Sequence, residues 1–267
     1  MKDLKEFWNQ RAKKYGHTGW IDPVIYAFDQ QARILSIEKI LSSLNFDNSA
    51  ALDFGTGSGD FAGLLSKYFK RVIAFDISEA VIKIAEQRYK ENENIKFYCA
   101  DNINKIGIGE RSLDLILSIT VLDHIMDYSE LFATVRHCQT ILKDTGFFII
   151  LESAGNSQKP KSFYKKFTKF SQWLSLFSDR GFLLYAYYQF YDPLECPCES
   201  YMSYRAGLGG LKAKIARLLA CNFHYRRADS YLKKLAKEHL ETKSDFFWQG
   251  DQRESPVKIM IFRKLLK

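Results

Sequence analysis

The feature that most constrains this chain is residues 50–60, which read AALDFGTGSGD. A short β-prone run reaches Asp53 and is followed at alternate positions by three glycines, Gly55, Gly57 and Gly59. An amphipathic segment, Phe61–Phe69, comes next and is expected to be a helix. A strand, a glycine turn and a helix in this order are typical of a nucleotide-type site at the carboxyl end of a parallel sheet. Glycine suits such a turn because the backbone bends sharply and a ligand approaches without meeting a Cβ atom.

The glycine spacing differs from that of a dinucleotide-binding fingerprint. That fingerprint is G-x-G-x-x-G, whereas this chain has G-x-G-x-G with an acid, Asp53, two positions before the first glycine. The turn therefore does not match the dinucleotide-binding fingerprint. A glycine turn alone is weak evidence, and the downstream strands supply the rest.

Two further predicted strands end next to polar residues. The strand at 71–75 is followed by Asp76 and Ile77, and an acid in this place accepts hydrogen bonds from ribose hydroxyls. Ser78 is the expected N-cap of the next helix. The strand at 95–100 is followed by Asp101 and Asn102. These acids are expected to meet the glycine turn at one edge of a parallel sheet.

A fourth predicted strand, 113–119, contains Ser118 and leads into the sequence TVLDH at residues 120–124. With these four strand ends the chain resembles the class I S-adenosylmethionine-dependent methyltransferases, whose motif is D/E-x-G-x-G-x-G. The resemblance implies that S-adenosylmethionine is the cofactor and S-adenosylhomocysteine the product. It also implies that the cofactor contacts lie at Asp53, Gly55, Gly57, Gly59, Asp76, Ile77, Asp101, Asn102 and Ser118.

The resemblance assigns roles within that set. The glycine turn is expected to pack against the amino-acid part and the ribose, and the acid after the third strand to bind the adenine amino group. A V-L-E-H run often closes over the cofactor in this family, and residues 121–124 are similar to it. Trp8, Arg11, Ala12 and Tyr15 resemble an N-terminal W-x-x-x-A-x-x-Y run, which implies that Tyr15 touches the cofactor carboxylate.

Three residues are candidate catalytic groups: His124, Asp29 and His17. His124 either lines the cofactor or acts as a base. His17 is a base or an ordinary loop histidine, and Asp29 either holds a cationic amine or is a helix-surface carboxylate. Glu152, at the end of the fifth predicted strand, faces the same rim by topology. A base is useful only if the acceptor arrives protonated, because methyl transfer depends mainly on holding the nucleophile in line.

Composition fits one α/β enzyme domain with an insertion. The chain has 267 residues with 46% hydrophobic content, a formal net charge of +8 and five cysteines. The odd cysteine number without framework spacing favours a reduced, cytoplasmic protein, and no membrane segment is expected. The Cys196-Pro-Cys198 pair is more simply two loop thiols than a metal site, so no metal is assigned and a metal-independent mechanism is preferred.

We expect a seven-stranded, mostly parallel Rossmann-like methyltransferase sheet with N-terminal helices and an inserted helical and aromatic lid. The expected parts are a helical cap at 1–48, the cofactor-binding core at 49–153, the lid at 154–222, and a closing helix and hairpin at 223–267. The hairpin strands are predicted at 245–249 and 257–263. Lysines and aromatics alternate at 161–170, which favours an amphipathic helix over a surface that stacks bases.

The predicted function is methyl transfer to nitrogen or oxygen of a small molecule or peptide, with nitrogen favoured. The layout is similar to natural-product methyltransferases such as those that methylate plantazolicin. No N-P-P-Y or D-P-P-Y tetrapeptide follows the fourth strand, which makes a nucleic-acid substrate unlikely. An RNA methyltransferase that uses the basic, aromatic insertion and a non-catalytic S-adenosylmethionine-binding protein stay as alternatives, and the oligomeric state is not predicted.

Overall fold

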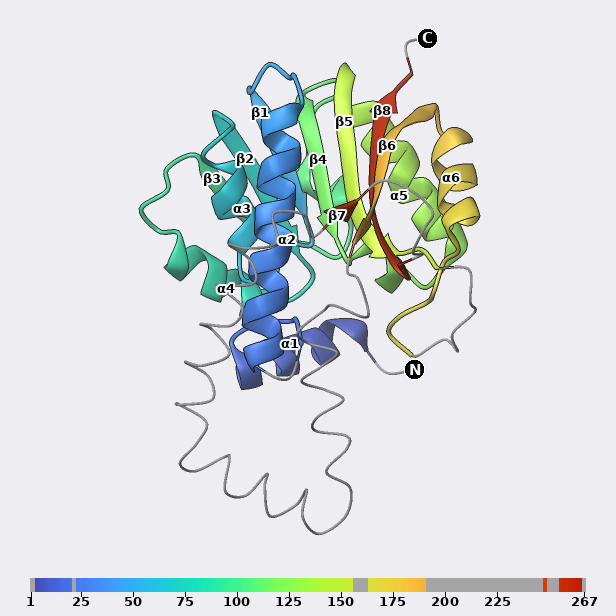
Figure 1. Cartoon of the computed structure of the whole chain (residues 1–267). Helices are drawn as coiled ribbons and strands as arrows, with labels where there is room; N and C mark the ends of the chain where they lie inside the picture. Colours follow the sequence, from blue (N-terminus) through green and yellow to red (C-terminus); the bar gives the residue numbers. More distant parts are fainter. Residues whose placement is uncertain (1–2, 21–22, 156–162, 191–246, 249–254, 266–267) are drawn as a thin grey trace. The chain divides into compact units, whose positions relative to one another are not determined.

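The computed structural model describes residues 3–20, 23–155, 163–190, 247–248 and 255–265 (Figure 1). The chain divides into two compact units, and each is described by itself. The first unit comprises Met1–Thr18, Ser43–Phe190 and Gln249–Lys267, and the second comprises Gly19–Ser42 and Tyr191–Trp248. Predictions for residues 191–246, including the Cys196–Cys198 pair, lie outside the described residues.

The first unit is built on a sheet in which seven strands follow the order β3-β2-β1-β4-β5-β8-β6 (Figure 1). The strands are β1 (Ala50–Phe54), β2 (Arg71–Asp76), β3 (Ile95–Cys99), β4 (Leu113–Ile119), β5 (Leu142–Ser153), β6 (Phe182–Phe190) and β8 (Val257–Lys264). The first five pair in parallel, and β8 runs antiparallel to both of its neighbours, β5 and β6. The predicted seven-stranded, mostly parallel sheet is therefore confirmed. A two-residue strand, β7 (Phe247–Trp248), belongs to the second unit.

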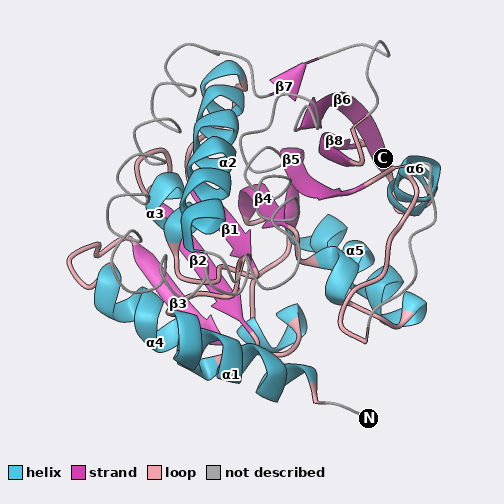
Figure 2. Ribbon diagram, turned by 60° about the horizontal axis from the view of Figure 1, so that its bottom comes forward, coloured by secondary structure: helices cyan, strands magenta, loops and turns pink. Residues whose placement is uncertain are grey.

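Helices cover this sheet. They are α1 (Leu4–Tyr15), α3 (Asp60–Leu65), α4 (Glu79–Arg88), α5 (Tyr128–Ile141) and α6 (Phe170–Ser178), with short 3-10 turns η1 (Ile103–Ile106) and η2 (Leu122–His124). Figure 2 shows α1 alongside α4, against which it packs. The long α2 (Pro23–Ser43) belongs to the second unit. Polar caps start three of these helices: Asp3, Ser78 and Asp127 each accept a hydrogen bond from a first-turn N–H.

The central strands are buried because helices lie on both faces of the parallel sheet. Every residue of β1 and of β4 is buried, and both strands read as nearly continuous apolar runs. At the other side of the sheet an aromatic layer joins α6 to the last strands. The Phe177 and Phe262 rings stack at 3.9 Å between centroids, and Phe177 also contacts Phe148 and Phe182.

The predicted boundaries of the lid and of the closing hairpin are wrong in part. Residues 170–190, which were placed inside the 154–222 insertion, form α6 and β6, and β6 is a core strand. The partner of β8 on this side is β6 rather than a strand at 245–249. The aromatic residues of this segment favoured an inserted lid, and only tertiary pairing shows that they belong to a strand of the sheet.

The predicted amphipathic helix at 161–170 is also wrong for the described part of that segment. Residues 163–169 contain no helix, and α6 begins at Phe170. Tertiary contacts override the helical period here. The Lys166 N–H donates to the Asp123 carbonyl at 3.0 Å, and the Phe163 and Tyr164 rings pack on Phe7 of α1 at 5.0 and 4.9 Å between centroids.

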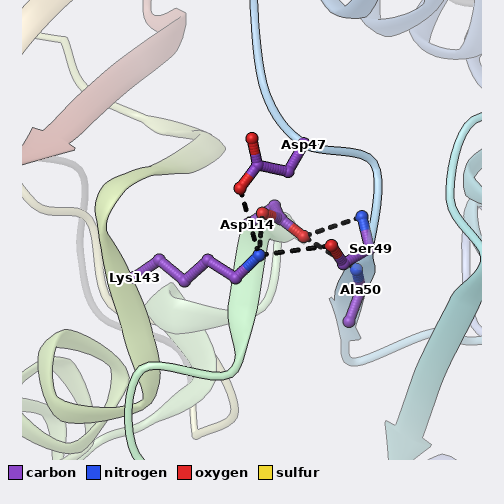
Figure 3. A network of polar contacts seen from close by, with 5 residues as sticks. All are labelled: Asp47, Ser49, Ala50, Asp114 and Lys143. Carbon is purple, nitrogen blue, oxygen red and sulfur yellow. Dashed lines mark hydrogen bonds and ion pairs between the residues drawn. The ribbon is translucent and has the colours of Figure 1, made fainter.

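A buried carboxylate ties together the amino ends of the central strands (Figure 3). Asp114 Oδ2 accepts the N–H groups of Ser49 at 2.9 Å and Ala50 at 2.8 Å. Its other oxygen, Oδ1, lies 2.6 Å from Lys143 Nζ, which also reaches Asp47 at 3.4 Å. Asp114 lies near the start of β4 and Lys143 near the start of β5. The network therefore holds together the first residues of β1, β4 and β5.

Candidate functional site

The glycine turn follows β1 in a left-handed conformation at all three glycines. The φ angles are 75° at Gly55, 54° at Gly57 and 85° at Gly59, a region that side chains with a Cβ atom rarely adopt. The N–H groups of Gly55 and Thr56 both donate to the Phe75 carbonyl at 2.9 Å. The turn is therefore bound to the end of β2, as a site at the carboxyl edge of a parallel sheet requires.

Space at the first glycine is closed by the segment after β4. A Cβ atom on Gly55 would lie 2.6 Å from Cγ1 of Val121 and closer still to Cγ2. Thr120, next to Val121, has a φ of 56°, which is unusual for a β-branched residue. Val121 thus packs directly against the first glycine, and the predicted closure of residues 121–124 over the cofactor stays a prediction.

Asp53 stabilises the glycine turn through a buried hydrogen bond. Its side chain is 1% exposed, and Oδ2 accepts a 2.6 Å hydrogen bond from the Thr56 hydroxyl. Burial raises the pKa of Asp53 to about 7. The described contacts of Asp53 shape the glycine turn, and its predicted contact with the cofactor stays a prediction.

Asp76 connects the glycine turn to the start of α4. Its Oδ2 accepts the Gly57 N–H at 3.1 Å and its Oδ1 accepts the Ser78 N–H at 2.9 Å. Burial raises the pKa of Asp76, while these backbone donors act in the opposite direction. The carboxylate is thus fixed beside the central glycine, where the sequence placed a ribose-binding group. Ile77 lies between these contacts, and its carbonyl accepts from Cys99 Sγ at 3.7 Å.

Helix α1 brings a second wall to the turn. Asn9 Oδ1 accepts from the Ser78 hydroxyl at 2.9 Å and from the Ala80 N–H at 3.1 Å. Arg11 of α1 donates from Nε to the carbonyl of Thr18, which lies past the end of the helix, at 3.0 Å. Thr18 Oγ1 would lie 3.2 Å from a Cβ on Gly57. The predicted contact of Tyr15 with the cofactor carboxylate stays a prediction. The contacts of Asn9 and Thr18 were missed, because neither residue belongs to a recognisable motif.

Tyr15 and His17 flank the bend after α1. Tyr15 is the last residue of α1, and its ring centroid lies 6.3 Å from that of His17. His17 is 8% exposed, and burial together with the nearby Arg11 lowers its pKa. A lowered pKa keeps the imidazole neutral near pH 7, which is compatible with a base but equally with a packed loop histidine.

The polar side chains that follow β3 contact residues close to them in the sequence. Asp101 is exposed and forms an ion pair with Lys105 at 2.8 Å, which lowers the pKa of Asp101. Asn102 caps η1 by accepting the Asn104 N–H at 2.9 Å. The predicted contacts of both residues with an adenine ring stay predictions. Ser118, in β4, is fully buried, and its hydroxyl finds no hydrogen-bond partner among the described residues.

His124 lies in an aromatic cluster rather than in an open pocket. Its ring centroid is 4.9 Å from Trp8 and 5.8 Å from Tyr164, and its Nδ1 donates to the Tyr164 carbonyl. Burial lowers the pKa of His124 to about 4. A group with so low a pKa is a weak base at neutral pH, so the packing interpretation of His124 is the better supported one.

The low pKa of His124 predicts a measurable pH effect on stability. In the unfolded chain a histidine titrates near 6.5, so between about pH 6.5 and 4 the unfolded state binds a proton that the native state does not. Relative to His124→Gln, the free energy of unfolding of the natural protein should fall by up to about 3 kcal/mol on going from pH 7 to pH 4. Urea unfolding at several pH values measures this, and a pH-independent difference would contradict the assignment.

Asp29, the candidate amine-binding acid, lies in the second unit and is already paired. Its Oδ2 accepts from Trp20 Nε1 at 2.9 Å and forms an ion pair with Arg33 at 2.8 Å. The side chain is 2% exposed, and burial raises the pKa of Asp29. The Arg33 guanidinium supplies the positive charge that an amine acceptor would have brought. The surface-carboxylate alternative is wrong, because the group is buried, and the amine-binding role stays a prediction.

Two features are absent from the described part of the chain. No group of three or more His, Cys, Asp or Glu residues there is arranged to hold a metal ion. Among the same residues, no helix has the length and apolar character needed to cross a membrane.

Comparison with known proteins agrees with this geometry. Residues 52–150 match the family model described as a methyltransferase domain. Over 116 residues the chain is 28% identical to a malonyl-[acyl-carrier protein] O-methyltransferase of Marinomonas sp., covering 42% of each protein. It is also 30% identical to phosphoethanolamine N-methyltransferase 3 of Arabidopsis thaliana over 46% of this chain and 25% of that protein. The chain thus spans less than half the length of these two relatives.

Solved structures show the same fold. A S-adenosylmethionine-dependent methyltransferase from Leishmania major has a TM-score of 0.60 at 17% identity, covering 72% of this chain and 78% of its own. The [4+2]-cyclase SpnF has a TM-score of 0.56 at 16% identity, covering 88% and 81%. At such identities the likeness concerns the fold. Together with the family match, it indicates a methyltransferase domain around residues 52–150 in a fold shared with these structures.

Proposed function

We propose that this chain binds S-adenosylmethionine and transfers its methyl group to nitrogen or oxygen of a small molecule or peptide. The observation that carries the proposal is the joint fixing of Asp76 and the glycine turn, through the hydrogen bond from Gly57 N–H to Asp76 Oδ2 at 3.1 Å. An acid held at the end of β2 beside a glycine-rich turn suits a ribose whose two hydroxyls donate to one carboxylate.

The residues present fit the proposed cofactor. Gly55, Gly57 and Gly59 give the turn three left-handed φ angles, and a residue with a Cβ atom would be strained at each of them. The Ser118 hydroxyl is buried without a partner among the described residues, and a bound ligand would supply one. Asp76 carries two oxygens, each of which has a second lone pair beyond its backbone donor.

Methyl transfer from S-adenosylmethionine requires few catalytic groups from the protein. When bound, S-adenosylmethionine supplies a methyl group activated by the positive charge on its sulfur. The chain's own task is to orient the acceptor in line with that methyl group and to exclude water. The post-β4 turn, Trp8 of α1 and the 163–169 segment are joined by the aromatic cluster around His124 and would provide such a wall. His17 stays the better candidate for a base, since the pKa of His124 is about 4.

A direct test is the substitution Asp76→Ala. Loss of the ribose hydrogen bonds should weaken S-adenosylmethionine binding by about 1–3 kcal/mol, measured by isothermal titration calorimetry. Asp127→Ala is a matched control, because Asp127 also caps a helix by accepting a backbone N–H but serves α5. Unchanged affinity in Asp76→Ala, or an equal loss in the control, would contradict the ribose assignment.

The acceptor class is a finer proposal with a separate test. We retain nitrogen of an amine or peptide natural product as the favoured acceptor, with oxygen as the alternative, and a cytoplasmic location as a prediction. Incubation with radiolabelled S-adenosylmethionine and panels of amines, phenols and amino-terminal peptides would show which class accepts the label. Tight cofactor binding with no label transferred to any panel would favour the non-catalytic alternative.

The RNA methyltransferase alternative loses part of its support. Two of the lysines that suggested it are engaged within the fold: Lys165 Nζ lies 3.7 Å from Asp123, and Lys166 Nζ lies 5.9 Å from the Tyr128 ring centroid. RNA binding with a steep salt dependence would restore this alternative.

A further inference from the structure

A buried glutamate holds the turn that follows β4. Glu152 Oε1 accepts hydrogen bonds from the N–H groups of Val121 and Leu122, both at 2.8 Å. Glu152 lies near the carboxyl end of β5 and is 0% exposed. These two N–H groups follow Thr120, whose positive φ turns the chain sharply out of β4. A single carboxylate oxygen therefore satisfies the backbone of a strained turn.

The turn that Glu152 holds is the one that covers the glycine site. The Val121 methyl groups occupy the space in which a Cβ on Gly55 would lie. A shift of the Val121 backbone would therefore open the contact with the first glycine. The position of Glu152 in β5 is itself fixed, since Leu151 accepts the Thr120 N–H at 2.8 Å and Glu152 is aligned with Lys258 of β8.

Glu152 shares its buried environment with Asp123 and Lys165. Asp123 is 0% exposed, and its Oδ2 lies 3.7 Å from Lys165 Nζ. Burial raises the pKa of Glu152 well above its usual value, and the neighbouring Asp123 raises it further. The two carboxyl groups therefore titrate as an interacting pair.

The same turn is fastened to the 163–169 segment. The Asp123 carbonyl accepts the Lys166 N–H at 3.0 Å, and His124 donates to the Tyr164 carbonyl. The residues after Val121 thus contact a segment that packs on α1, while Val121 itself contacts the glycine turn. Glu152 lies where these two sets of contacts meet.

We propose that Glu152 is a positioning residue that sets cofactor affinity by binding the N–H groups of Val121 and Leu122 and so holding Val121 against the glycine turn. This inference deepens the proposed function and rests on it, since S-adenosylmethionine is the ligand whose binding is measured. Glu152 acts through the backbone and touches no reacting atom. Its neutral form keeps a carbonyl oxygen that accepts both N–H groups, so the role needs the oxygen and not the charge.

The experiment compares Glu152→Ala with Glu152→Gln. Alanine removes the acceptor, whereas glutamine keeps one side-chain oxygen at the same reach. In Glu152→Ala the amides of Val121 and Leu122 should exchange with solvent faster in the cofactor-free protein, and S-adenosylmethionine should bind about tenfold more weakly. Glu152→Gln should restore binding to within about threefold of the natural protein. Glu130→Ala, an exposed glutamate of α5, is the matched control.

The exchange and binding measurements separate failure of this inference from failure of the proposed function. If the natural protein does not bind S-adenosylmethionine, the proposed function fails, whereas amide exchange still tests the hold on the turn. Unchanged exchange in Glu152→Ala, or faster exchange with unchanged affinity, would overturn the inference. Equal losses in the alanine and glutamine variants would also overturn it, because the charge would then matter. Should Glu152→Ala not fold, Glu152→Asp, whose carboxylate is one methylene shorter, takes its place with the same expected outcomes.

Discussion

Gly55→Ala is expected to reduce S-adenosylmethionine affinity by about two orders of magnitude. The alanine at position 55 would have to adopt a left-handed φ, which costs about 1–2 kcal/mol. Its Cβ would also collide with Val121, a form of overpacking that costs about 1–3 kcal/mol. Relief of the collision displaces the post-β4 turn or the glycine turn, and both are walls of the proposed site. Because about 1.4 kcal/mol corresponds to a tenfold change, calorimetric titration resolves the expected loss.

Gly107→Ala separates the collision from the backbone cost. Gly107 has a φ of 70°, close to the 75° of Gly55, but a Cβ there meets nothing within 4 Å. The control should therefore lose about 1–2 kcal/mol of stability and keep its cofactor affinity. Similar affinities in the two variants would show that the contact between Gly55 and Val121 does not shape the site.

Asp114→Ala is expected to lower the free energy of unfolding by about 3–5 kcal/mol. The substitution leaves the N–H groups of Ser49 and Ala50 and the Lys143 ammonium without the acceptor shown in Figure 3. Asp114 is 2% exposed, so little water can replace the lost oxygens. Urea unfolding followed by circular dichroism measures the change. Folded Asp114→Ala should still bind S-adenosylmethionine, because the network lies at the amino ends of the strands.

Asp47→Ala is the control for this network. Asp47 contacts the same Lys143 at 3.4 Å, but its side chain is 73% exposed. An exposed ion pair contributes about 0–1 kcal/mol, so the control should be nearly as stable as the natural protein. Equal effects of the two substitutions would mean that the buried hydrogen bonds of Asp114 contribute little.

The predicted core agrees with the structure where one local pattern decides it. The strands at 50–54, 71–76, 95–99 and 113–119 follow from short apolar runs, each ended by a turn or an acid. The approach of Asp76 to Gly57 was also predictable. Parallel strands joined by helices bring their carboxyl ends to one edge, so residues 19 positions apart meet.

Predictions failed where distant parts of the chain compete for the same segment. Residues 163–169 have helical spacing, yet contacts with Asp123 and with Phe7 hold them in an irregular conformation. β6 was placed in a lid because an aromatic run does not reveal its partner strand. Asp29 was considered as an amine-binding group, and its pairing with Trp20 and Arg33 appears only in the folded chain.

The sequence by itself determined the parallel core, the glycine turn and the acid beside it, because conformational limits on glycine and the periodicity of apolar residues are local properties. Only the tertiary structure decided how the site is closed. The cover of Gly55 by Val121, the hold of Glu152 on that turn and the burial of His124 depend on residues far apart in the chain. Their energies arise from packing and desolvation, which exist only once β1, β4 and β5 lie side by side.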